Sequence, residues 1–393
     1  MYSGGGERTA IYESMMLQRM GHNVTCFAPA IRTDLCFPDF IGRIDLQGVI
    51  PRVRMKIPFR DLASMLASSV LAPLFAEKFK DFDVILSHGQ PATWIGYLIS
   101  RVAVKPRATY LHQPARFLYP RPIDLRVGWR TKADLALLQG IVETLSPLAR
   151  RLDHASVASS DVVMTNSYWI GEQIRKIYGV EVIVCPPGVD TDKFVPADNK
   201  TSIEVKGHAV AKPFILSTNR HYPQKGLADL IRIFALVRKS TDVRLVVTGD
   251  FTSYTPFLKR LSLDLGVNDR VFFTGYVPDD DLARLYQNAD VYAFTSPEED
   301  FGLGPLEAMA CGTPAVVWDY AGPSETVVDG INGYKVKPYN LRDFSDKILG
   351  LLFDQSLNYE LGKNGARFVR ERFTWTKHVA TVERTLSRLA ARS

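Results

Sequence analysis

The sequence predicts an α/β protein built from two doubly wound, Rossmann-like domains. The chain has 393 residues, more than a single hydrophobic core usually serves, so we expect two domains of ordinary size. Short apolar runs alternate with helical periodicity along its length, which is typical of parallel strands covered by helices on both faces. Several runs end in glycine or polar loops, and ligands bind at the carboxyl ends of strands in such sheets.

The first domain begins with a glycine loop at residues 3–7. A helical pattern follows and stops at Gly21, and a strand is expected at 23–27. A doubly wound domain normally has a strand before such a loop, but only Met1 and Tyr2 precede it here. We therefore expect the first strand of the N-terminal domain to be missing. Either the sequence is a fragment or another segment fills that place.

His112 is a candidate functional residue of this domain. Further strands are expected at 82–88, 107–112, 162–165 and 182–185, and His112 ends the second of them, just before a proline that stops the sheet. A lone histidine is more often structural, but a strand's carboxyl end is a ligand position. The polar, aperiodic residues 197–212 are predicted to be a linker.

The second domain starts with a strand at 213–218 that leads into a loop carrying Arg220 and Lys225. Arginine can chelate phosphate oxygens with two nitrogens, and lysine acts as a point charge. The pair at this sheet edge therefore predicts a diphosphate site, although surface bases are the commoner alternative.

Residues 295–312 are the most informative stretch. Gly302 allows close backbone approach, and a helix is expected to begin at Pro305. The amide groups near Gly302 and Leu303 would then attract an anion. We expect the nearby carboxylates to hold neutral hydroxyls, so the predicted ligand carries both sugar and phosphate.

The two carboxylates are Glu299 and Glu307, with seven residues between them. Each has a simpler explanation. Glu299 is one acid among several in a loop, and Glu307 is a carboxylate in the first helical turn, where the helix dipole stabilises negative charge.

The remaining elements continue the alternation. Strands are expected at 244–249, 271–277 and 314–318, and helices at 341–353 and 375–389. The acidic run 279–281 starts a helix, where aspartates cap the chain and favour the dipole, so we expect no metal site there.

Charge and cysteine usage limit the partners. The net charge is +6, and residues 40–138 hold 15 basic against 7 acidic side chains. This excess predicts an anionic partner, either lipid headgroups or a phosphate-bearing acceptor, and no nucleic-acid motif accompanies it. The four cysteines form no Cys-x-x-Cys pair, which indicates a reducing cytosol. The longest uncharged stretch, 62–76, is too short to span a bilayer; it is expected to be a core helix or, alternatively, a helix on a membrane surface.

Three motifs carry a family resemblance. The Glu-x7-Glu spacing within 299–312 resembles the donor-site signature of group 1 (family 4) retaining glycosyltransferases, which have the GT-B fold. Residues 219–226 resemble the family's Gly-Arg-x-x-x-x-Lys-Gly element, with Asn219 in place of the usual glycine. Residues 110–116 resemble its Tyr-x-His-x-Pro-x-Arg element.

The resemblance implies an architecture. Two Rossmann-like domains would face each other across a cleft, with residues 1–200 on the acceptor side and 201–372 binding the sugar nucleotide. Residues 373–393 would form a helix that crosses back to the first domain.

The resemblance also implies roles for single residues. Those on the donor side are Glu307 at the ribose, Glu299 at hydroxyls of the transferred sugar, Arg220 and Lys225 at the diphosphate, Gly302 and Leu303 as amide donors, and the backbone at Val277 near the nucleobase. Those facing the sugar from the other domain are His112 and the loop containing Gly5 and Gly6.

The implied reaction is transfer of a sugar from a nucleoside diphosphate to an acceptor hydroxyl, with retention and with neither a metal nor another cofactor. Residues 110–116 and 298–303 resemble those of mannosyltransferases that use GDP-mannose. The acceptor would belong to glycan, lipopolysaccharide or glycolipid synthesis, and the enzyme would be cytoplasmic or peripheral at the inner face of an anionic membrane. The alternatives are a catalytically impaired sugar-nucleotide-binding relative, a GT-B sugar-nucleotide epimerase, or a glycogen-type phosphorylase, although no lysine-anchored cofactor motif is found.

Overall fold

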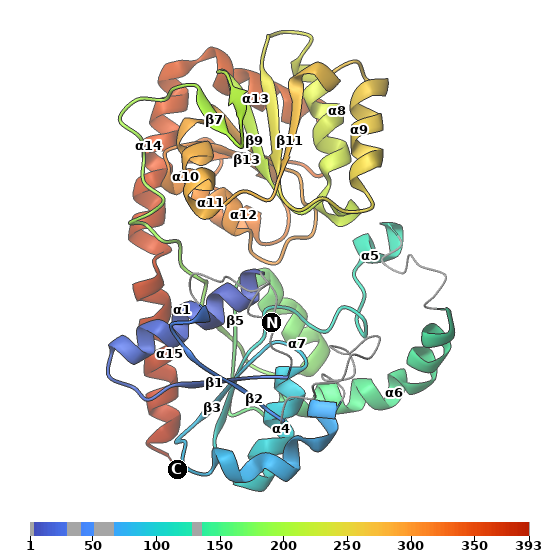
Figure 1. Cartoon of the computed structure of the whole chain (residues 1–393), viewed down its shortest axis with the longest axis vertical. Helices are drawn as coiled ribbons and strands as arrows, with labels where there is room; N and C mark the ends of the chain where they lie inside the picture. The colour runs from blue at the N-terminus through green and yellow to red at the C-terminus, as the bar shows by residue number, and fades with distance from the viewer. Residues whose placement is uncertain (1–3, 30–40, 51–66, 128–135, 393) are drawn as a thin grey trace. The chain divides into compact units, whose positions relative to one another are not determined.

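The computed structural model describes residues 4–29, 41–50, 67–127 and 136–392, and it divides into two compact units (Figure 1). The first unit comprises Met1–Pro122, Gly128–Pro187 and Trp375–Ser393. The second comprises Ile123–Val127 and Gly188–Thr374. The predicted cleft between the two domains stays a prediction.

The second unit is built on a six-stranded parallel sheet with the strand order β11-β10-β9-β12-β13-β14. Its strands are β9 (Phe214–Thr218), β10 (Arg244–Thr248), β11 (Val271–Gly275), β12 (Val291–Phe294), β13 (Ala315–Trp318) and β14 (Gly333–Val336). The order runs outward in opposite directions from β9 and β12, so these neighbours form the topological switch point. Loops after β9 and β12 meet there, where doubly wound sheets bind ligands.

Helices cover both faces of this sheet. They are η3 (Pro223–Lys225), α8 (Leu227–Val237), α9 (Thr255–Asp264), η4 (Asn268–Arg270), α10 (Asp279–Asn288), α11 (Leu303–Ala310), α12 (Pro323–Thr326), α13 (Leu341–Phe353) and α14 (Gln355–Arg372). Buried apolar side chains form one core on each side of the strands. Burial on both faces explains why these strands read as continuous apolar runs and not as alternating ones.

The first unit contains two parallel sheets within the described residues. The larger has the order β3-β4-β5-β6, from β3 (Ile85–His88), β4 (Arg107–Tyr110), β5 (Val162–Thr165) and β6 (Ile183–Val184). The smaller pairs β1 (Thr25–Ala28) with β2 (Asp45–Gly48). The missing first strand stays a prediction, because residues 1–3 lie outside the described part.

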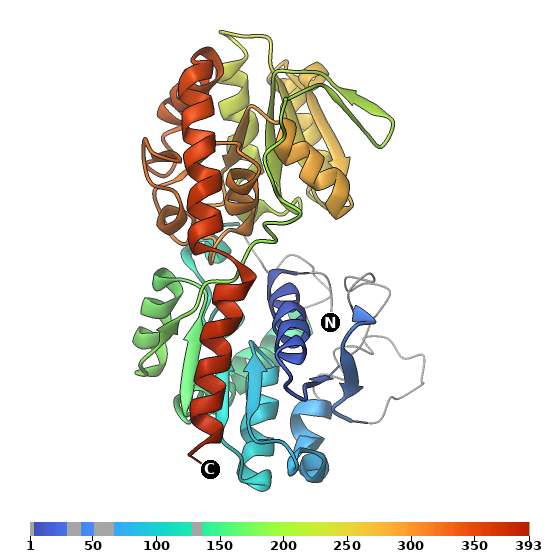
Figure 2. The ribbon, with the colours of Figure 1, turned by 90° about the vertical axis from the view of Figure 1, so that its left-hand side faces the viewer.

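The helices of the first unit come from both ends of the chain. They are α1 (Gly5–Arg19), η1 (Ala72–Phe79), α4 (Ala92–Ala103), α6 (Ala136–Ala158), α7 (Tyr168–Tyr178) and α15 (Trp375–Ala390), while α5 (Pro122–Val127) falls almost wholly in the second unit. Helices α1 and α15 pack together (Figure 2), and the rings of Tyr12 and Trp375 stack with centroids 4.5 Å apart. The expected helices at 341–353 and 375–389 are confirmed.

Residues 197–212, predicted to be a linker, have regular structure of their own and lie within the second unit. This segment holds an antiparallel hairpin of β7 (Ile203–Val205) and β8 (His208–Val210). Ile203, Val205 and Val210 are buried in a core of the second unit. Three-residue strands are too short for their alternation to stand out from the polar residues around them. Of the apolar stretch 62–76, residues 62–66 lie outside the described part.

Candidate functional site

The loops after β9 and β12 pack against each other and are joined by a hydrogen bond at the switch point. Gly226 has a φ of 67° and lies so close to the Thr295 carbonyl that a Cβ atom there would overlap it. The Thr295 hydroxyl also donates a hydrogen bond to the Gly226 carbonyl at 3.0 Å. A side chain at 226 would therefore separate the two loops, and glycine is required by both its φ and its surroundings.

This packing places one predicted cation against one predicted carboxylate. Lys225 Nζ lies 2.6 Å from Glu299 Oε2, and the Ser296 hydroxyl donates to the same oxygen at 2.8 Å. Both charged side chains are mostly buried, at 26% and 20% exposure. Arg220 is exposed in the same loop, with its guanidinium 5.9 Å from the centre of the Tyr222 ring.

Glu307 differs from the sequence expectation. Helix α11 begins at Leu303, two residues before Pro305, so Glu307 lies beyond the first turn. Its exposure is only 7%, and the Tyr286 hydroxyl donates to Oε2 at 2.9 Å. The prediction that the helix starts at Pro305 is therefore wrong, because Gly302, with a φ of 85°, already turns the chain into the helix.

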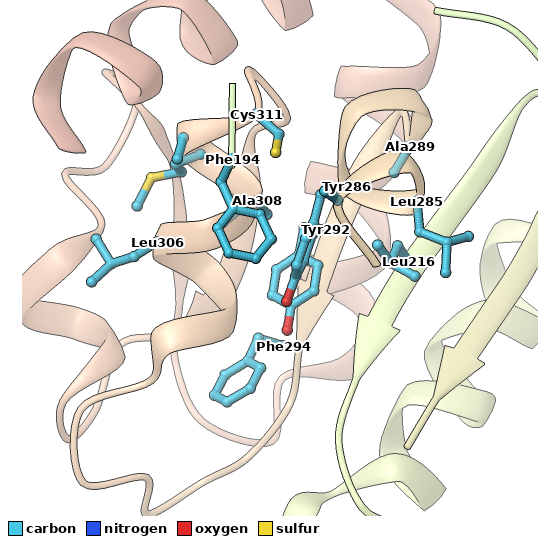
Figure 3. Close-up of a cluster of buried hydrophobic side chains, with 14 of the residues drawn as sticks. Phe194, Leu216, Leu285, Tyr286, Ala289, Tyr292, Phe294, Leu306, Ala308 and Cys311 are labelled. Atoms are coloured by element: carbon cyan, nitrogen blue, oxygen red, sulfur yellow. The ribbon is translucent and has the colours of Figure 1, made fainter. Parts of the chain in front are cut away.

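A short polar network holds Glu307 in place. The Tyr286 hydroxyl lies 2.9 Å from Thr218 Oγ1, which in turn lies 2.8 Å from the Tyr292 hydroxyl. The two phenol oxygens point the same way within an otherwise apolar cluster (Figure 3). Burial and the adjacent Glu307 charge raise the pKa of Tyr286 well above its ordinary value. The phenol thus stays protonated and donates to the carboxylate, so this oxygen is fixed in position.

The glycine turn before α11 is tightly enclosed. A Cβ on Gly304 would collide with the Tyr292 hydroxyl, and one on Gly302 would lie 3.0 Å from Pro323. The Gly322 amide donates to the Glu299 carbonyl at 3.0 Å, so the turn at 321–326 fixes the carboxylate loop from the other side.

The structure also locates Val277 and residues 279–281, for which the sequence made predictions. Val277 is 5% exposed and packs in an apolar core, so the contact of its backbone with a nucleobase stays a prediction. Residues 279–281 start α10, as predicted. No group of His, Cys, Asp or Glu in the described residues is arranged to hold a metal ion.

In the first unit, the glycine loop and the predicted histidine come together. Helix α1 starts at Gly5, and a Cβ on Gly6 would lie 3.2 Å from the His112 ring. The Asn166 side chain donates to the His112 carbonyl at 3.1 Å. Burial lowers the pKa of His112 to about 3. His112 is therefore a neutral imidazole held against the glycine backbone.

Sequence reasoning missed three charged or titratable residues beside His112. The buried Glu13 of α1 lies 2.9 Å from Nε2 of His88 and 2.7 Å from Nε2 of His378. His88 Nδ1 in turn lies 3.4 Å from His112 Nε2. A carboxylate on the apolar face of the first helix, and a histidine at the end of the strand before His112, were the available signals.

Within the described ranges, no helix is both long enough and apolar enough to cross a bilayer.

Two models of protein families together match nearly the whole chain. Residues 3–193 match the family described as Glycosyltransferase Family 4, and residues 198–368 match Glycosyl transferases group 1. The two matches meet near the start of the second unit.

Curated relatives share moderate identity. The chain is 29% identical to a D-inositol 3-phosphate glycosyltransferase of Acidothermus cellulolyticus, over 94% of this chain and 83% of that protein. It is also 29% identical to a GDP-mannose-dependent alpha-(1-6)-phosphatidylinositol monomannoside mannosyltransferase of Mycolicibacterium smegmatis, over 62% of this chain and 66% of that protein.

Solved structures show the fold. A sucrose-phosphate synthase from Thermosynechococcus elongatus superposes with a TM-score of 0.78 at 19% identity, covering 99% of this chain and 94% of that one. Anabaena Alr3699/HepE, solved in complex with UDP-glucose, gives 0.74 at 20% identity, with 98% and 96% coverage. Both likenesses extend over both units.

Proposed function

Because the chain belongs to the group 1, family 4 glycosyltransferases of GT-B fold, we propose that it transfers a hexose with retained anomeric configuration and without a metal ion. Transfer of a sugar from a nucleotide sugar is the activity of the family. The stereochemistry, the metal independence, the donor and the acceptor are the parts that the proposal adds.

The observation that carries the proposal is the meeting of the Lys225 loop with the Glu299 loop at the switch point. Negative charge builds on the diphosphate as the glycosidic bond breaks. Lys225 and Arg220 would oppose that charge, and the amides at Gly302 and Leu303 would add dipoles aimed at it. These groups supply the role that a divalent cation has in other transferases.

The surroundings of Glu299 favour a hydroxyl-binding role over a nucleophilic one. A double displacement needs a carboxylate nucleophile at the anomeric carbon. One oxygen of Glu299 already accepts from both Lys225 and Ser296, which lowers its nucleophilicity. We therefore favour attack by the acceptor on the same face that the diphosphate leaves. When the donor binds, Lys225 can contact the diphosphate and Glu299 together, since an ammonium group has three donors.

Glu307 is proposed to accept hydrogen bonds from the ribose. Its orientation is set in advance by Tyr286 and Thr218, so little side-chain freedom would be lost on binding. His112, with Gly5 and Gly6, is proposed to contact the transferred sugar as a neutral group, which suits a carbohydrate better than a charged one.

For the donor and acceptor we propose GDP-mannose and a phosphorylated polyol or its lipid-linked form. The relatives named for inositol phosphate and for GDP-mannose support this choice, and the basic excess in residues 40–138 suits a phosphate group. The same excess supports the prediction of peripheral contact with an anionic membrane.

A donor panel tests the proposal. GDP-mannose, UDP-glucose and the bare diphosphates are compared by calorimetry, then each donor is offered with inositol phosphates and phosphatidylinositol. Proton NMR of the product reads the anomeric configuration. Donor binding without transfer would support the impaired relative, release of an altered nucleotide sugar without acceptor would support the epimerase, and inverted product would refute the stereochemistry.

Substitution of Arg220 tests the diphosphate assignment. A charge-assisted hydrogen bond contributes roughly 1.5 to 3 kcal/mol, so Arg220→Ala should lower kcat/KM by about tenfold to a hundredfold. Arg232→Ala, which removes an exposed arginine paired with Asp229 on α8, is the matched control. Equal kinetics in the two variants would contradict the assignment, and loss of activity in EDTA would contradict metal independence.

A further inference from the structure

We propose that Glu13 and His88 are positioning residues for His112: Glu13 orients His88, and His88 holds the His112 ring in the tautomer that carries its proton on Nε2. The inference rests on the proposed function for its kinetic consequence, but not for its structural one. Neither residue belongs to any of the three family motifs.

The first step is the position of the carboxylate. Glu13 is 1% exposed on α1, and its two oxygens face different histidines. Oε1 accepts from His378 Nε2 at 2.7 Å, and Oε2 lies 2.9 Å from His88 Nε2. An ionised carboxylate accepts hydrogen bonds but cannot donate them, so we infer that the nitrogen facing each oxygen carries a proton. The contact with His378 is a hydrogen bond, whereas the contact with His88 is within ion-pair distance but is not aligned as a hydrogen bond.

The charge of this carboxylate is secured by its surroundings. Burial alone would raise the pKa of Glu13, but its interactions with His88 and His378 bring it well below its ordinary value. His378 also contacts the Pro186 carbonyl through Nδ1 at 2.9 Å, with Cys185 Sγ nearby at 3.4 Å. His378 thus serves as the counter-ion of Glu13.

The position of the proton on His88 determines the tautomer of His112, because a neutral imidazole carries a proton on only one of its two ring nitrogens. With its Nε2 proton turned to Glu13, a neutral His88 has an unprotonated Nδ1. That nitrogen lies 3.4 Å from His112 Nε2, a long contact that fits a proton on the His112 nitrogen and a lone pair on the His88 nitrogen. His112 would then keep an unprotonated Nδ1, able to accept a hydrogen bond from a sugar hydroxyl.

Packing keeps the rings from turning. The His88 and Tyr110 rings stack with centroids 5.4 Å apart, and the Tyr110 ring lies 4.8 Å from that of His112. Gly6 closes the other side of His112. The titratable groups that face His112 across these elements are thus His88 on β3, Tyr110 on β4, Glu13 on α1 and His378 on α15.

The test replaces His88 in two ways. In His88→Gln the amide can still donate to Glu13 and accept from His112, whereas His88→Phe keeps a ring of similar size without either function. The full chain is labelled with ¹⁵N-histidine, and the ring-nitrogen shifts of His112, assigned with a His112→Gln variant, report its tautomer between pH 5 and 8. Glu13→Gln is measured in the same way.

We expect His112 to be the Nε2-protonated tautomer in the natural chain and in His88→Gln, and a mixture of tautomers in His88→Phe and Glu13→Gln. With the donor and acceptor of the proposed reaction, kcat should fall about tenfold in His88→Phe, while the KM for the donor stays unchanged and His88→Gln restores most of the rate.

An unchanged His112 tautomer in His88→Phe would overturn the inference, as would a natural chain in which Nδ1 carries the proton. If the natural chain transfers no sugar from any donor, the proposed function fails while the nitrogen shifts still decide the inference. If Glu13→Gln does not fold, the two His88 variants decide it alone.

Discussion

The buried contact between His378 and Glu13 should make the first unit lose stability as the solution becomes alkaline. Burial alone would lower the pKa of His378, but hydrogen bonds with Cys185 and Glu13 raise it from 6.5 to about 10. A group whose pKa is raised on folding stabilises the folded state fully below its unfolded pKa. That stabilisation is lost as the pH rises toward the folded value.

The magnitude follows from that window. Each pKa unit corresponds to about 1.4 kcal/mol, so the free energy of unfolding should fall by about 1.4 kcal/mol per pH unit between pH 6.5 and 10. The whole window is worth about 5 kcal/mol. Glu13 adds nothing here, because its lowered pKa affects stability only in acid.

The measurement is hydrogen exchange of the α1 and α15 amides, corrected for the intrinsic rate at each pH, in the natural chain and in His378→Gln. Since other groups titrate in both proteins, the difference between the two isolates the histidine. We expect the two free energies to converge as the pH rises from 7 to 10. Parallel curves would refute the claim that His378 is charged in the folded state.

Two substitutions test the site itself. Tyr286→Phe removes one hydrogen-bond donor to Glu307. Because a lost hydrogen bond to a charged group costs roughly 1.5 to 3 kcal/mol, nucleoside diphosphate binding should weaken at least tenfold by calorimetry. Unchanged affinity would show that Glu307 does not need this support. Gly6→Ala places a Cβ 3.2 Å from His112, whereas Gly5→Ala meets nothing within 4 Å. Both variants change the loop proposed to contact the sugar, but only Gly6→Ala also displaces His112. We therefore expect kcat to be about tenfold lower in Gly6→Ala than in Gly5→Ala, and equal rates in the two variants would contradict a role of His112 at the reacting sugar.

The sequence predicted the second unit more fully than the first. Its strands are buried on both faces, so they appear as apolar runs, and the loops with Arg220 and Glu299 follow β9 and β12 directly. That Lys225 and Glu299 form an ion pair was not predictable, because pairing depends on β9 and β12 being neighbours, 74 residues apart at the paired side chains. Strand order leaves no local pattern in the sequence.

The polar network of the first unit was harder to predict for the same reason. His112 was recognisable from its strand end, but Glu13, His88 and His378 come from three other elements of the chain. Glu13 offered one local signal, a carboxylate among apolar residues of a helix. Its partners could be identified only when α15 was known to return to α1.

The return of α15 also has a consequence for biosynthesis. The second unit is nearly continuous from Gly188 to Thr374, whereas the first needs Trp375–Ser393 for completion. On the ribosome, the later-made unit can therefore finish folding before the earlier one, against the usual N-terminal-first order. Until α15 emerges, Glu13 has no His378 to neutralise it, so the first unit can be completed only after the second unit has been made.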